Sequence, residues 1–465
     1  MKKGDNVEIS IESFSGNGKA VARRDGLIYF IEDAVPGDVV VAKIWKVKKN
    51  YVEARAIEII KPSEHRITPK CKHFGICGGC KWQNLNYDSQ LIFKQKHVLD
   101  TFIHIGNITH PNVQPVIGCP DIYFYRNKME YTFSNYQWLA TYQKLEKQNP
   151  EIALGLHVPE RYDKVLNIEE CFLQSELSYL ILNTVRKICR ELNLSVYSTK
   201  THEGYLRHLV IRDSKKTKEL MVNLVTTYDS EDTMRYISQQ LLNEYPEITT
   251  FVNNITDRKS LVAFGEYEKV YYGSGYITEK LGEYLFHISS NSFFQTNTLQ
   301  AEKLYSIVKE LANLKKSDVV YDLYSGTGTI AIYLSKEVER VVGIEVVQSA
   351  IKDAEKNAKA NSISNCFFIL GDLKNLLLID NSWLNNHPKP SVIIVDPPRS
   401  GVHPKVIESI IKLNPNKIVY VSCNPATQAR DAKMLLQGGY DLKIVKPVDM
   451  FPHTDHIESV ALFES

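Results

Sequence analysis

The sequence contains no apolar run long enough to span a membrane and no low-complexity tract in its 465 residues. Its first residues, MKKGDNVEIS, lack the apolar core of a secretory signal peptide. These absences predict a cytoplasmic protein without a membrane partner. A strong excess of charge of one sign is also missing, since the formal net charge is +2. Charge alone therefore does not identify a nucleic-acid-binding protein, and any basic surface must be local.

Cysteine is scarce, and the eight cysteines of the chain are not expected to form a disulfide framework in a reducing compartment. Three of them, Cys71, Cys77 and Cys80, are clustered in CKHFGICGGC with the spacing C-x5-C-x2-C. The glycines of this stretch allow the loop to fold back so that several sulfurs face one point. Thiolates suit either zinc or an iron–sulfur cluster. A fourth ligand is needed, and spacing alone does not select it.

The chain is too long for one ordinary domain, and its patterns divide it into three regions. Residues 1–62 contain short β-rich runs separated by turn signals, which predicts a small barrel. Residues 63–285 hold the cysteine cluster, a helical pattern and mixed strands and helices, which predicts a central α+β domain. In the barrel, Trp45 and Tyr51 lie near several lysines, which suits a nucleic-acid surface but equally a solvated strand edge. These lysines are Lys43, Lys46, Lys48 and Lys49.

From residue 286 to residue 465 the pattern changes to a regular alternation of strands and helices, which predicts a parallel sheet. The expected strands lie in SDVVYDL, VERVVGIEVV, CFFILGD, SVIIVDPP, KIVYVSC, YDLKIVKPVDMF and IESVALFE. We therefore predict an α/β protein whose C-terminal domain is doubly wound around a seven-stranded, Rossmann-like sheet.

A glycine loop follows the first of these strands in DLYSGTGTIA. Gly326 and Gly328 allow a tight turn and a close approach to a ligand, and Glu345 ends the next strand, where it can accept hydrogen bonds from a ribose. Ala331 stands where the dinucleotide fingerprint has its third glycine, and that fingerprint sometimes allows alanine, so the glycines alone do not exclude NAD. With Asp322 before the loop and DPP after the fourth strand, the set resembles the nucleoside–methionine site of class I methyltransferases.

Three further side chains stand at strand ends. Asp396 ends the fourth strand in VDPPRSG, because two prolines cannot continue a central strand. Cys423 ends the fifth strand in VSCNP, and Glu458 begins the last strand in HIESVALFE. In the methyltransferase topology the last strand runs antiparallel to the others, so its beginning meets their ends. We expect these three side chains to converge beside the glycine loop.

This constellation predicts methylation of carbon 5 of a uracil. That carbon is a poor nucleophile, but a thiolate added at carbon 6 makes it enolate-like, and a base must then remove its proton. Cys423 is the candidate nucleophile, Glu458 the candidate base and Asp396 a partner for the pyrimidine. A methyltransferase acting on cytosine or on an amine remains an alternative, although DPPRSG lacks the cysteine typical of cytosine enzymes. A non-catalytic RNA-binding assembly factor is the other alternative.

The motifs SSNSFFQTN, DLYSGTGT, DPPRSG, VSCNP and HIESVALF together resemble, in order, those of the RNA uridine-5 methyltransferase family. The N-terminal strands resemble a TRAM domain, an RNA-binding barrel. The layout is similar to that of the iron–sulfur type that methylates 23S ribosomal RNA. The resemblance implies an S-adenosylmethionine-dependent enzyme that binds RNA, with large-subunit ribosomal RNA as the expected substrate, transfer RNA as the alternative, and a monomer as the expected state.

The resemblance also implies roles for individual residues. Cys423 is the nucleophile and Glu458 the proton-removing base. The expected residues of the S-adenosylmethionine and uracil pocket are Gln295, Tyr324, Thr329, Glu345, Asp372 and Asp396. Several family members have asparagine where this chain has Thr329. Because IEECFLQS resembles the motif that supplies the fourth metal ligand, the implied cofactor is a [4Fe–4S] cluster held by Cys71, Cys77, Cys80 and Cys171.

Overall fold

The computed structural model describes residues 2–136, 152–159, 161–260, 263–378 and 382–465. The N-terminal region is one six-stranded sheet in the order β1-β5-β6-β4-β3-β2, as the strand signals predict. Alternate residues of its strands, such as Val40, Ala42 and Ile44, point into a small apolar core. The strands are β1 (Asn6–Ser10), β2 (Ser13–Phe14), β3 (Ala20–Arg24), β4 (Leu27–Glu32), β5 (Val39–Val47) and β6 (Tyr51–Lys61).

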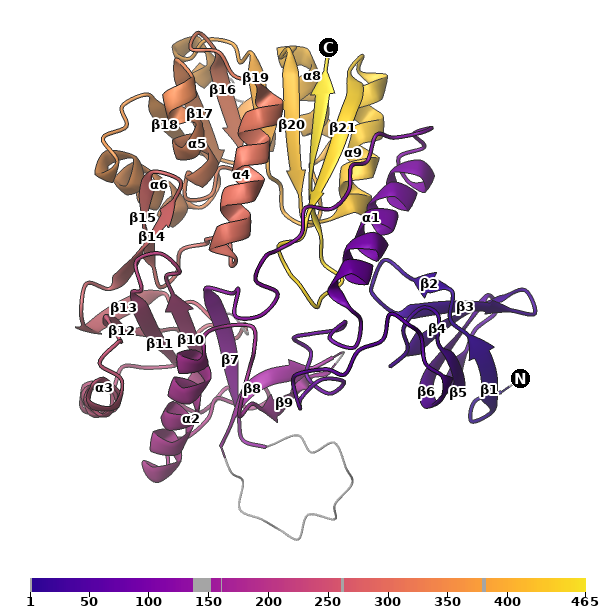
Figure 1. Cartoon of the computed structure of the whole chain (residues 1–465). Coiled ribbons are helices and arrows are strands. Elements are labelled where there is room, and N and C mark those ends of the chain that lie inside the picture. The colour runs from indigo at the N-terminus through magenta and orange to yellow at the C-terminus, as the bar shows by residue number, and fades with distance from the viewer. Residues whose placement is uncertain (1, 137–151, 160, 261–262, 379–381) are drawn as a thin grey trace.

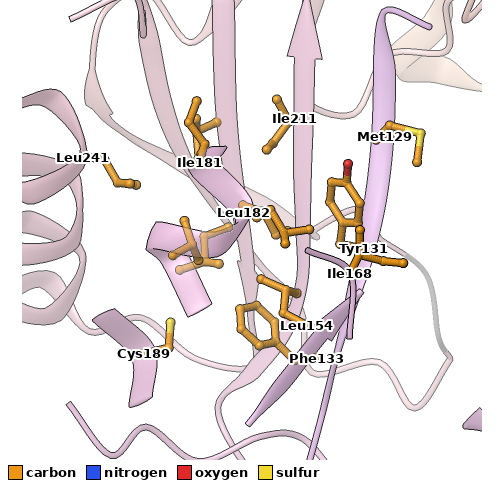
Figure 2. Packing of buried hydrophobic residues seen from close by; sticks show 14 of the residues in the cluster. Met129, Tyr131, Phe133, Leu154, Ile168, Ile181, Leu182, Cys189, Ile211 and Leu241 are labelled. Atoms are coloured by element: carbon orange, nitrogen blue, oxygen red, sulfur yellow. The ribbon is translucent and has the colours of Figure 1, made fainter. Parts of the chain in front are cut away.

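The central region is a seven-stranded mixed sheet in the order β13-β12-β11-β10-β7-β8-β9. Two helices cover one face, where Ile181 and Leu182 of α2 and Leu241 of α3 pack with Tyr131 and Ile211 of the strands (Figure 2). The strands are β7 (Lys128–Ser134), β8 (Ala153–Val158), β9 (Arg161–Asn167), β10 (Leu206–Asp213), β11 (Leu220–Thr226), β12 (Thr250–Ile255) and β13 (Tyr267–Tyr272). The helices are α2 (Glu176–Glu191) and α3 (Glu231–Glu244).

The C-terminal region is a seven-stranded sheet in the order β18-β17-β16-β19-β20-β22-β21. Only β22 runs antiparallel to its neighbours, which confirms the predicted doubly wound domain with a reversed last strand. The strands are β16 (Val319–Leu323), β17 (Arg340–Glu345), β18 (Cys366–Leu370), β19 (Val392–Val395), β20 (Lys417–Ser422), β21 (Asp441–Val448) and β22 (Glu458–Glu464).

Helices cover both faces of this sheet, as the apolar runs of its strands require. One face packs against α4 (Thr298–Ala312), α5 (Thr329–Leu334) and α6 (Gln348–Ala360). The other packs against α7 (Leu373–Leu378), α8 (Pro404–Leu413), α9 (Pro425–Gln437) and, from much earlier in the chain, α1 (Tyr87–His104). Val98 and Phe102 of α1 are fully buried in this second layer. Short 3₁₀ turns lie at Ser335–Glu337 and Ser382–Asn386.

A two-stranded hairpin of β14 (Tyr276–Leu281) and β15 (Tyr284–Ser289) precedes the C-terminal sheet. Its backbone is held by α6, since Asn361 Oδ1 accepts a hydrogen bond from the Leu285 N–H and Asn357 Oδ1 accepts one from the His287 N–H. The expected boundary at residues 285 and 286 therefore lies inside β15, and the hairpin packs with the C-terminal region. No helix in the described part of the chain is both long and apolar enough to cross a membrane.

The loop between β21 and β22 reaches from the C-terminal sheet toward the centre of the molecule (Figure 1). Asp449 in this loop forms a fully buried ion pair with Lys94 of α1, with Nζ and Oδ1 2.7 Å apart. The Tyr87 hydroxyl donates to the other carboxylate oxygen at 2.9 Å. Buried charges are stable only when they are paired and hydrogen-bonded, and both conditions are met here. The pair therefore fixes α1 to the loop that leads into β22.

Replacing Lys94 by methionine should lower the free energy of unfolding by about 3–5 kcal/mol, because the Asp449 carboxylate stays buried without its partner. The matched control is Lys96→Met on the same helix, whose ion pair with Asp100 is largely exposed. An exposed pair contributes about 0–1 kcal/mol. Urea unfolding of the three proteins measures the difference. Equal losses in the two variants would contradict a special contribution of the buried pair.

Candidate active site

The glycine loop after β16 follows the predicted course. Tyr324, Gly326 and Gly328 have φ angles of 65°, 55° and 73°, all in the left-handed region. A Cβ on Gly328 would lie 2.8 Å from the Phe368 ring, so this position requires glycine for space as well as for conformation. Asp322, at the end of the strand, is buried and accepts a hydrogen bond from the Ser325 hydroxyl at 2.8 Å. Burial raises the pKa of Asp322 to about 7.

A cavity of about 160 Å³ opens beside this loop and is lined by Tyr324, Glu345 and Asp372. One carboxylate oxygen of Glu345 accepts a hydrogen bond from the Gly326 N–H at 3.0 Å. Its other oxygen accepts from the N–H groups of the next two residues at 2.8 and 2.9 Å. The loop and β17 therefore hold the carboxylate in a fixed position. The three predicted cofactor residues that line this cavity come from the ends of three adjacent strands, β16, β17 and β18.

The other three predicted pocket residues do not line this cavity. Thr329 begins α5, and its hydroxyl lies 3.1 Å from the hydroxyl of Tyr305. Gln295 precedes α4, and its carbonyl accepts a hydrogen bond from the Asn127 side chain at 2.8 Å. Asp396 follows β19 and donates its N–H to the Leu323 carbonyl at 3.2 Å, which keeps it beside the glycine loop. Burial, followed by the charge of Asp322, raises the pKa of Asp396 to about 7.

Cys423 and Glu458 meet at the end of the β20–β22 ladder. Ser422 and Ser459 are the last paired residues of this ladder, so the next position on one strand is Cys423 and on the other Glu458. The Glu458 side chain is buried, and burial, followed by the charge of Asp396, raises its pKa well above the usual range. Burial raises the pKa of the Cys423 thiol to about 11, with further contributions from Glu458 and Asp396. The predicted convergence of these residues is therefore present.

The residues after Cys423 explain why the thiol stands at a strand end. Asn424 caps α9, with its side-chain oxygen accepting the Ala426 N–H at 3.1 Å, and Pro425 occupies the first turn, where it needs no N–H partner. The Asn424 amide also donates to the Arg399 carbonyl at 2.9 Å. This bond ties the VSCNP loop to the DPPRSG loop, so the thiol and Asp396 are positioned together.

Two site residues were not identified from the sequence. Tyr305 of α4 is buried, and after burial itself the charges of Asp396, Asp322 and Glu458 raise its pKa, so its phenol lies among the three acids. Arg399 is exposed, and its positive charge lowers the pKa values of both Cys423 and Glu458, against the larger effect of burial. Arg399 is visible in the quoted motif DPPRSG, but Tyr305 carries no local signal.

The four predicted metal-ligating cysteines share one small cavity of about 20 Å³. Cys71, Cys77 and Cys80 come from the loop before α1, and Cys171 comes from the segment after β9. Two sulfurs already accept hydrogen bonds, Cys77 from the Gly79 N–H at 3.4 Å and Cys80 from the Gln83 side chain at 3.3 Å. Among the described residues, no three His, Cys, Asp or Glu side chains are spaced to hold a single metal ion.

The basic residues of the N-terminal sheet and those of the central sheet differ in exposure. In the N-terminal sheet Trp45 is exposed, and the Lys46 ammonium lies 5.6 Å from its ring centroid and 5.8 Å from that of Tyr51. In the central sheet, Arg207 and Arg212 are each only 2% exposed. These two arginines are therefore not part of an exposed basic surface.

Comparison with known proteins finds two matching family models, several relatives and a similar solved structure. The family model described as tRNA (uracil-5-)-methyltransferase matches residues 205–465, and the TRAM domain model matches residues 1–57. The chain is 45% identical to an "uncharacterized RNA methyltransferase" of Chlorobaculum tepidum over 100% of this chain and 97% of that protein. It is 43% identical to another from Bacteroides thetaiotaomicron over 97% and 99% of the two chains.

A solved structure is similar over nearly the whole length. It is the Pyrococcus abyssi tRNA (uracil-54, C5)-methyltransferase in complex with S-adenosyl-L-homocysteine. The two chains are 29% identical, with a TM-score of 0.75 and coverage of 98% of this chain and 100% of that one.

The burial of Cys423, together with the acids around it, predicts slow alkylation of its thiol at neutral pH. A thiolate forms only as the pH approaches the thiol pKa of about 11, so the rate should rise about tenfold per pH unit between about pH 7 and 10. Glu458→Gln should lower this pKa, because it removes a negative charge that disfavours the thiolate. Mass spectrometry of the Cys423 peptide after iodoacetamide treatment measures the rate.

The control for this measurement is Glu464→Gln, at the far end of the same strand, where Glu464 pairs with Lys417. It should leave the pH profile unchanged. A wild-type midpoint near the ordinary cysteine value of about 8.5 would contradict the described environment.

Proposed function

Because the chain belongs to the tRNA (uracil-5-)-methyltransferase family, we propose that it transfers a methyl group from S-adenosylmethionine to carbon 5 of a uridine in RNA. One observation carries the proposal. Cys423 and Glu458 stand side by side at the end of the β20–β22 ladder, with Asp396 beside them. A thiol and a base at one point are what this reaction needs, and methylation of an amine needs no thiol.

The reaction begins when the Cys423 thiolate adds to carbon 6 of the uracil. The new carbon–sulfur bond converts the C5=C6 double bond into an enolate that extends from carbon 5 to oxygen 4. Carbon 5 then takes the methyl group and still carries its original hydrogen. Glu458 removes that proton, the double bond forms again, and the bond from carbon 6 to the sulfur breaks to return the thiolate. The balance is one methyl group gained and one proton released.

The environments of the two groups suit these roles. The raised pKa of Glu458 makes its carboxylate a stronger base than an exposed glutamate. Arg399 favours the thiolate of Cys423 and so opposes part of the effect of the acids. Asp396, whose pKa is raised to about 7, is the proposed hydrogen-bond partner of the pyrimidine ring.

We assign the cavity beside the glycine loop to the methyl donor. Tyr324, Glu345 and Asp372 line it, and a fixed carboxylate at the end of β17 is the group that accepts hydrogen bonds from a ribose. Gln295 and Thr329 are proposed to complete the site on the side of α4 and α5. S-adenosylmethionine supplies the electrophilic methyl group when it is bound there. The S-adenosyl-L-homocysteine complex of the Pyrococcus abyssi protein supports this assignment.

We propose large-subunit ribosomal RNA as the substrate, because a TRAM domain combined with four clustered cysteines is the layout that the motifs share with 23S ribosomal RNA enzymes. Transfer RNA is the second candidate. It is favoured by the similar Pyrococcus abyssi structure, whose protein acts on uracil 54 of transfer RNA. Both RNA classes belong in the same assay.

We also propose that the four cysteines hold a [4Fe–4S] cluster. Their donor set suits it, since each iron takes one cysteine thiolate and hydrogen bonds to the sulfurs tune such clusters. All four cysteines line one small cavity, although three come from the loop before α1 and one from the segment after β9. The methyl transfer needs no electron, so the proposed role is structural.

Tritium release tests the methylation. RNA from cells lacking the gene, labelled at uracil carbon 5, should release tritium to water when protein and S-adenosylmethionine are added. Cys423→Ala should abolish release, because no enolate forms. Glu458→Gln should accumulate a protein–RNA adduct that survives denaturing electrophoresis, because the methylated intermediate keeps its proton. Ser459→Ala, the next residue on β22, is the control and should retain activity.

The outcomes separate the alternatives. Full methyl transfer by Cys423→Ala would disprove the covalent route. Methyl incorporation without tritium release would indicate another atom, such as a cytosine carbon or an amine. Bound RNA without either signal would favour a non-catalytic assembly factor. Mapping the methylated nucleotide in ribosomal and transfer RNA decides the substrate class.

The cluster predicts iron and acid-labile sulfide in anaerobically purified protein. Cys171→Ser should lose most of both, because it removes one of the four thiolates. Cys189→Ser is the matched control, since Cys189 is buried on α2 outside the cysteine cavity and should leave the metal content unchanged. Protein that contains zinc and no iron would contradict the cluster.

A further inference from the structure

A separate cavity of about 190 Å³ lies where the N-terminal sheet meets α1. Its walls come from segments far apart in the sequence. Phe14 belongs to β2, Trp82 to the end of the cysteine loop, Phe93 and His97 to α1, and Asp455 to the loop between β21 and β22. None of these residues lines the cavity assigned to the methyl donor.

One side of this cavity is aromatic. The Phe14 ring stacks on Trp82, with centroids 4.6 Å apart and planes 28° apart. Phe93 meets Phe14 edge to face, with centroids 5.2 Å apart. Trp82 is buried, and its indole N–H donates to the Gly18 carbonyl at 3.2 Å, so the wall is rigid. A wall of this kind favours a flat, apolar-faced ligand.

Asp455 also lines this cavity, and one of its carboxylate oxygens has no hydrogen-bond partner. Asp455 Oδ2 accepts a hydrogen bond from the Lys81 ammonium at 2.9 Å, whereas the buried Oδ1 has no hydrogen-bond partner. The Asp455 side chain is only 8% exposed. A buried acceptor left unpaired is costly, so this oxygen indicates a ligand that donates a hydrogen bond.

The charged side chains at this cavity exclude some classes of ligand. The other two lysines at the cavity are engaged, Lys94 with Asp449 and Lys96 with Asp100. A phosphate would therefore meet the free carboxylate oxygen rather than a free cation. A bare metal ion would find too few ligands, since no suitable group of three exists in the described residues. A neutral planar ligand with an N–H donor remains.

We propose that this cavity binds one base of the substrate RNA, an adenine, cytosine or guanine turned out of its stack, through its exocyclic amino group. Single-stranded bases are recognised in this way, by aromatic contact and hydrogen bonds to their edges, and a carboxylate accepts from an amino group. Uracil offers only its ring N3–H, and the two carbonyls beside it would bring acceptors close to the Asp455 oxygen, so a base with an amino group is favoured. The proposal rests on the proposed RNA substrate and adds a second recognised base.

The position of Asp455 connects this base to the chemistry. Asp455 is three residues before Glu458 in the same segment. A Cβ on Gly18 would lie 2.8 Å from the Asp455 Cβ, so the N-terminal region packs closely against this segment. A nucleobase bound in this cavity would contact both the N-terminal sheet and the Asp455 segment. It would thereby hold the segment that leads to Glu458 against that sheet.

The test uses RNA analogues and the variant Asp455→Asn. The asparagine keeps the shape and can keep its oxygen toward Lys81, but it replaces the free acceptor with a donor. Once the methylated site is mapped, each neighbouring base is replaced in turn by an analogue that lacks the amino group. At one position the wild-type protein should lose affinity about tenfold, and Asp455→Asn should be indifferent to the same change.

Lys81→Met is the matched control, because it removes the ion pair but keeps the acceptor, and it should remain as sensitive as the wild type. Equal sensitivity of wild type and Asp455→Asn at every position would overturn the proposal.

Ultraviolet crosslinking of wild-type protein to the RNA is a second measurement that does not depend on a variant folding. It should attach an amino-bearing base to the peptide of Phe14 or Phe93. Absence of that crosslink while tritium is released would overturn this site alone. A crosslink without tritium release from any RNA would support the site and overturn the proposed reaction.

Discussion

The buried pair of Lys94 and Asp449 is the interaction on which the rest of the arrangement depends. It holds α1, which lies early in the chain, against the loop that precedes β22 at its end. The same loop receives hydrogen bonds from the cysteine loop, where the N–H groups of Lys81 and Trp82 donate to the His453 carbonyl at 2.9 and 3.0 Å. Residues of α1 and of the cysteine loop thus both contact one segment, and that segment ends at Glu458. The proposed role of Glu458, removal of one proton from one carbon, needs such fixation.

The contact of the cysteine loop with the segment before Glu458 connects the four cysteines to the candidate active site. Cys80 is directly followed by Lys81 and Trp82, the two residues that hold the His453 carbonyl. The loop that carries three of the four thiols is therefore in contact with the segment that carries Glu458, although the cysteine cavity and the acids occupy different regions. Ordering the cysteine loop also orders the contact surface of that segment. A structural metal centre would act on methylation through this contact, without any transfer of electrons.

The sequence predicts the C-terminal domain well, because its signals are local. Its strands are apolar runs with polar residues at their ends, and the topology brings the ends of the parallel strands and the start of the reversed last strand to one edge of the sheet, so Asp396, Cys423 and Glu458 could be placed together. The packing of α1 on this sheet could not be predicted, since its helical periodicity says which face is apolar but not what covers it. The burial of Arg207 and Arg212 on β10 could not be predicted for the same reason, because burial of a charged side chain depends on partners distant in the chain.

Tyr305 is a residue of the candidate site that only the fold reveals. A tyrosine on a helix has no chemical signature, yet the fold places its phenol among three acids. Burying acids close together makes each a weaker acid, so that protons are retained where a solvated site would lose them. The proposed reaction needs both a strong base at Glu458 and a thiolate at Cys423. The buried acids favour the first and disfavour the second. Arg399 is the residue that eases the conflict, because its charge favours the thiolate. It stands in an exposed loop that Asn424 ties to the loop of Cys423. Substrate that covers this loop would exclude water from around Arg399 and strengthen its effect at the moment the thiolate is needed.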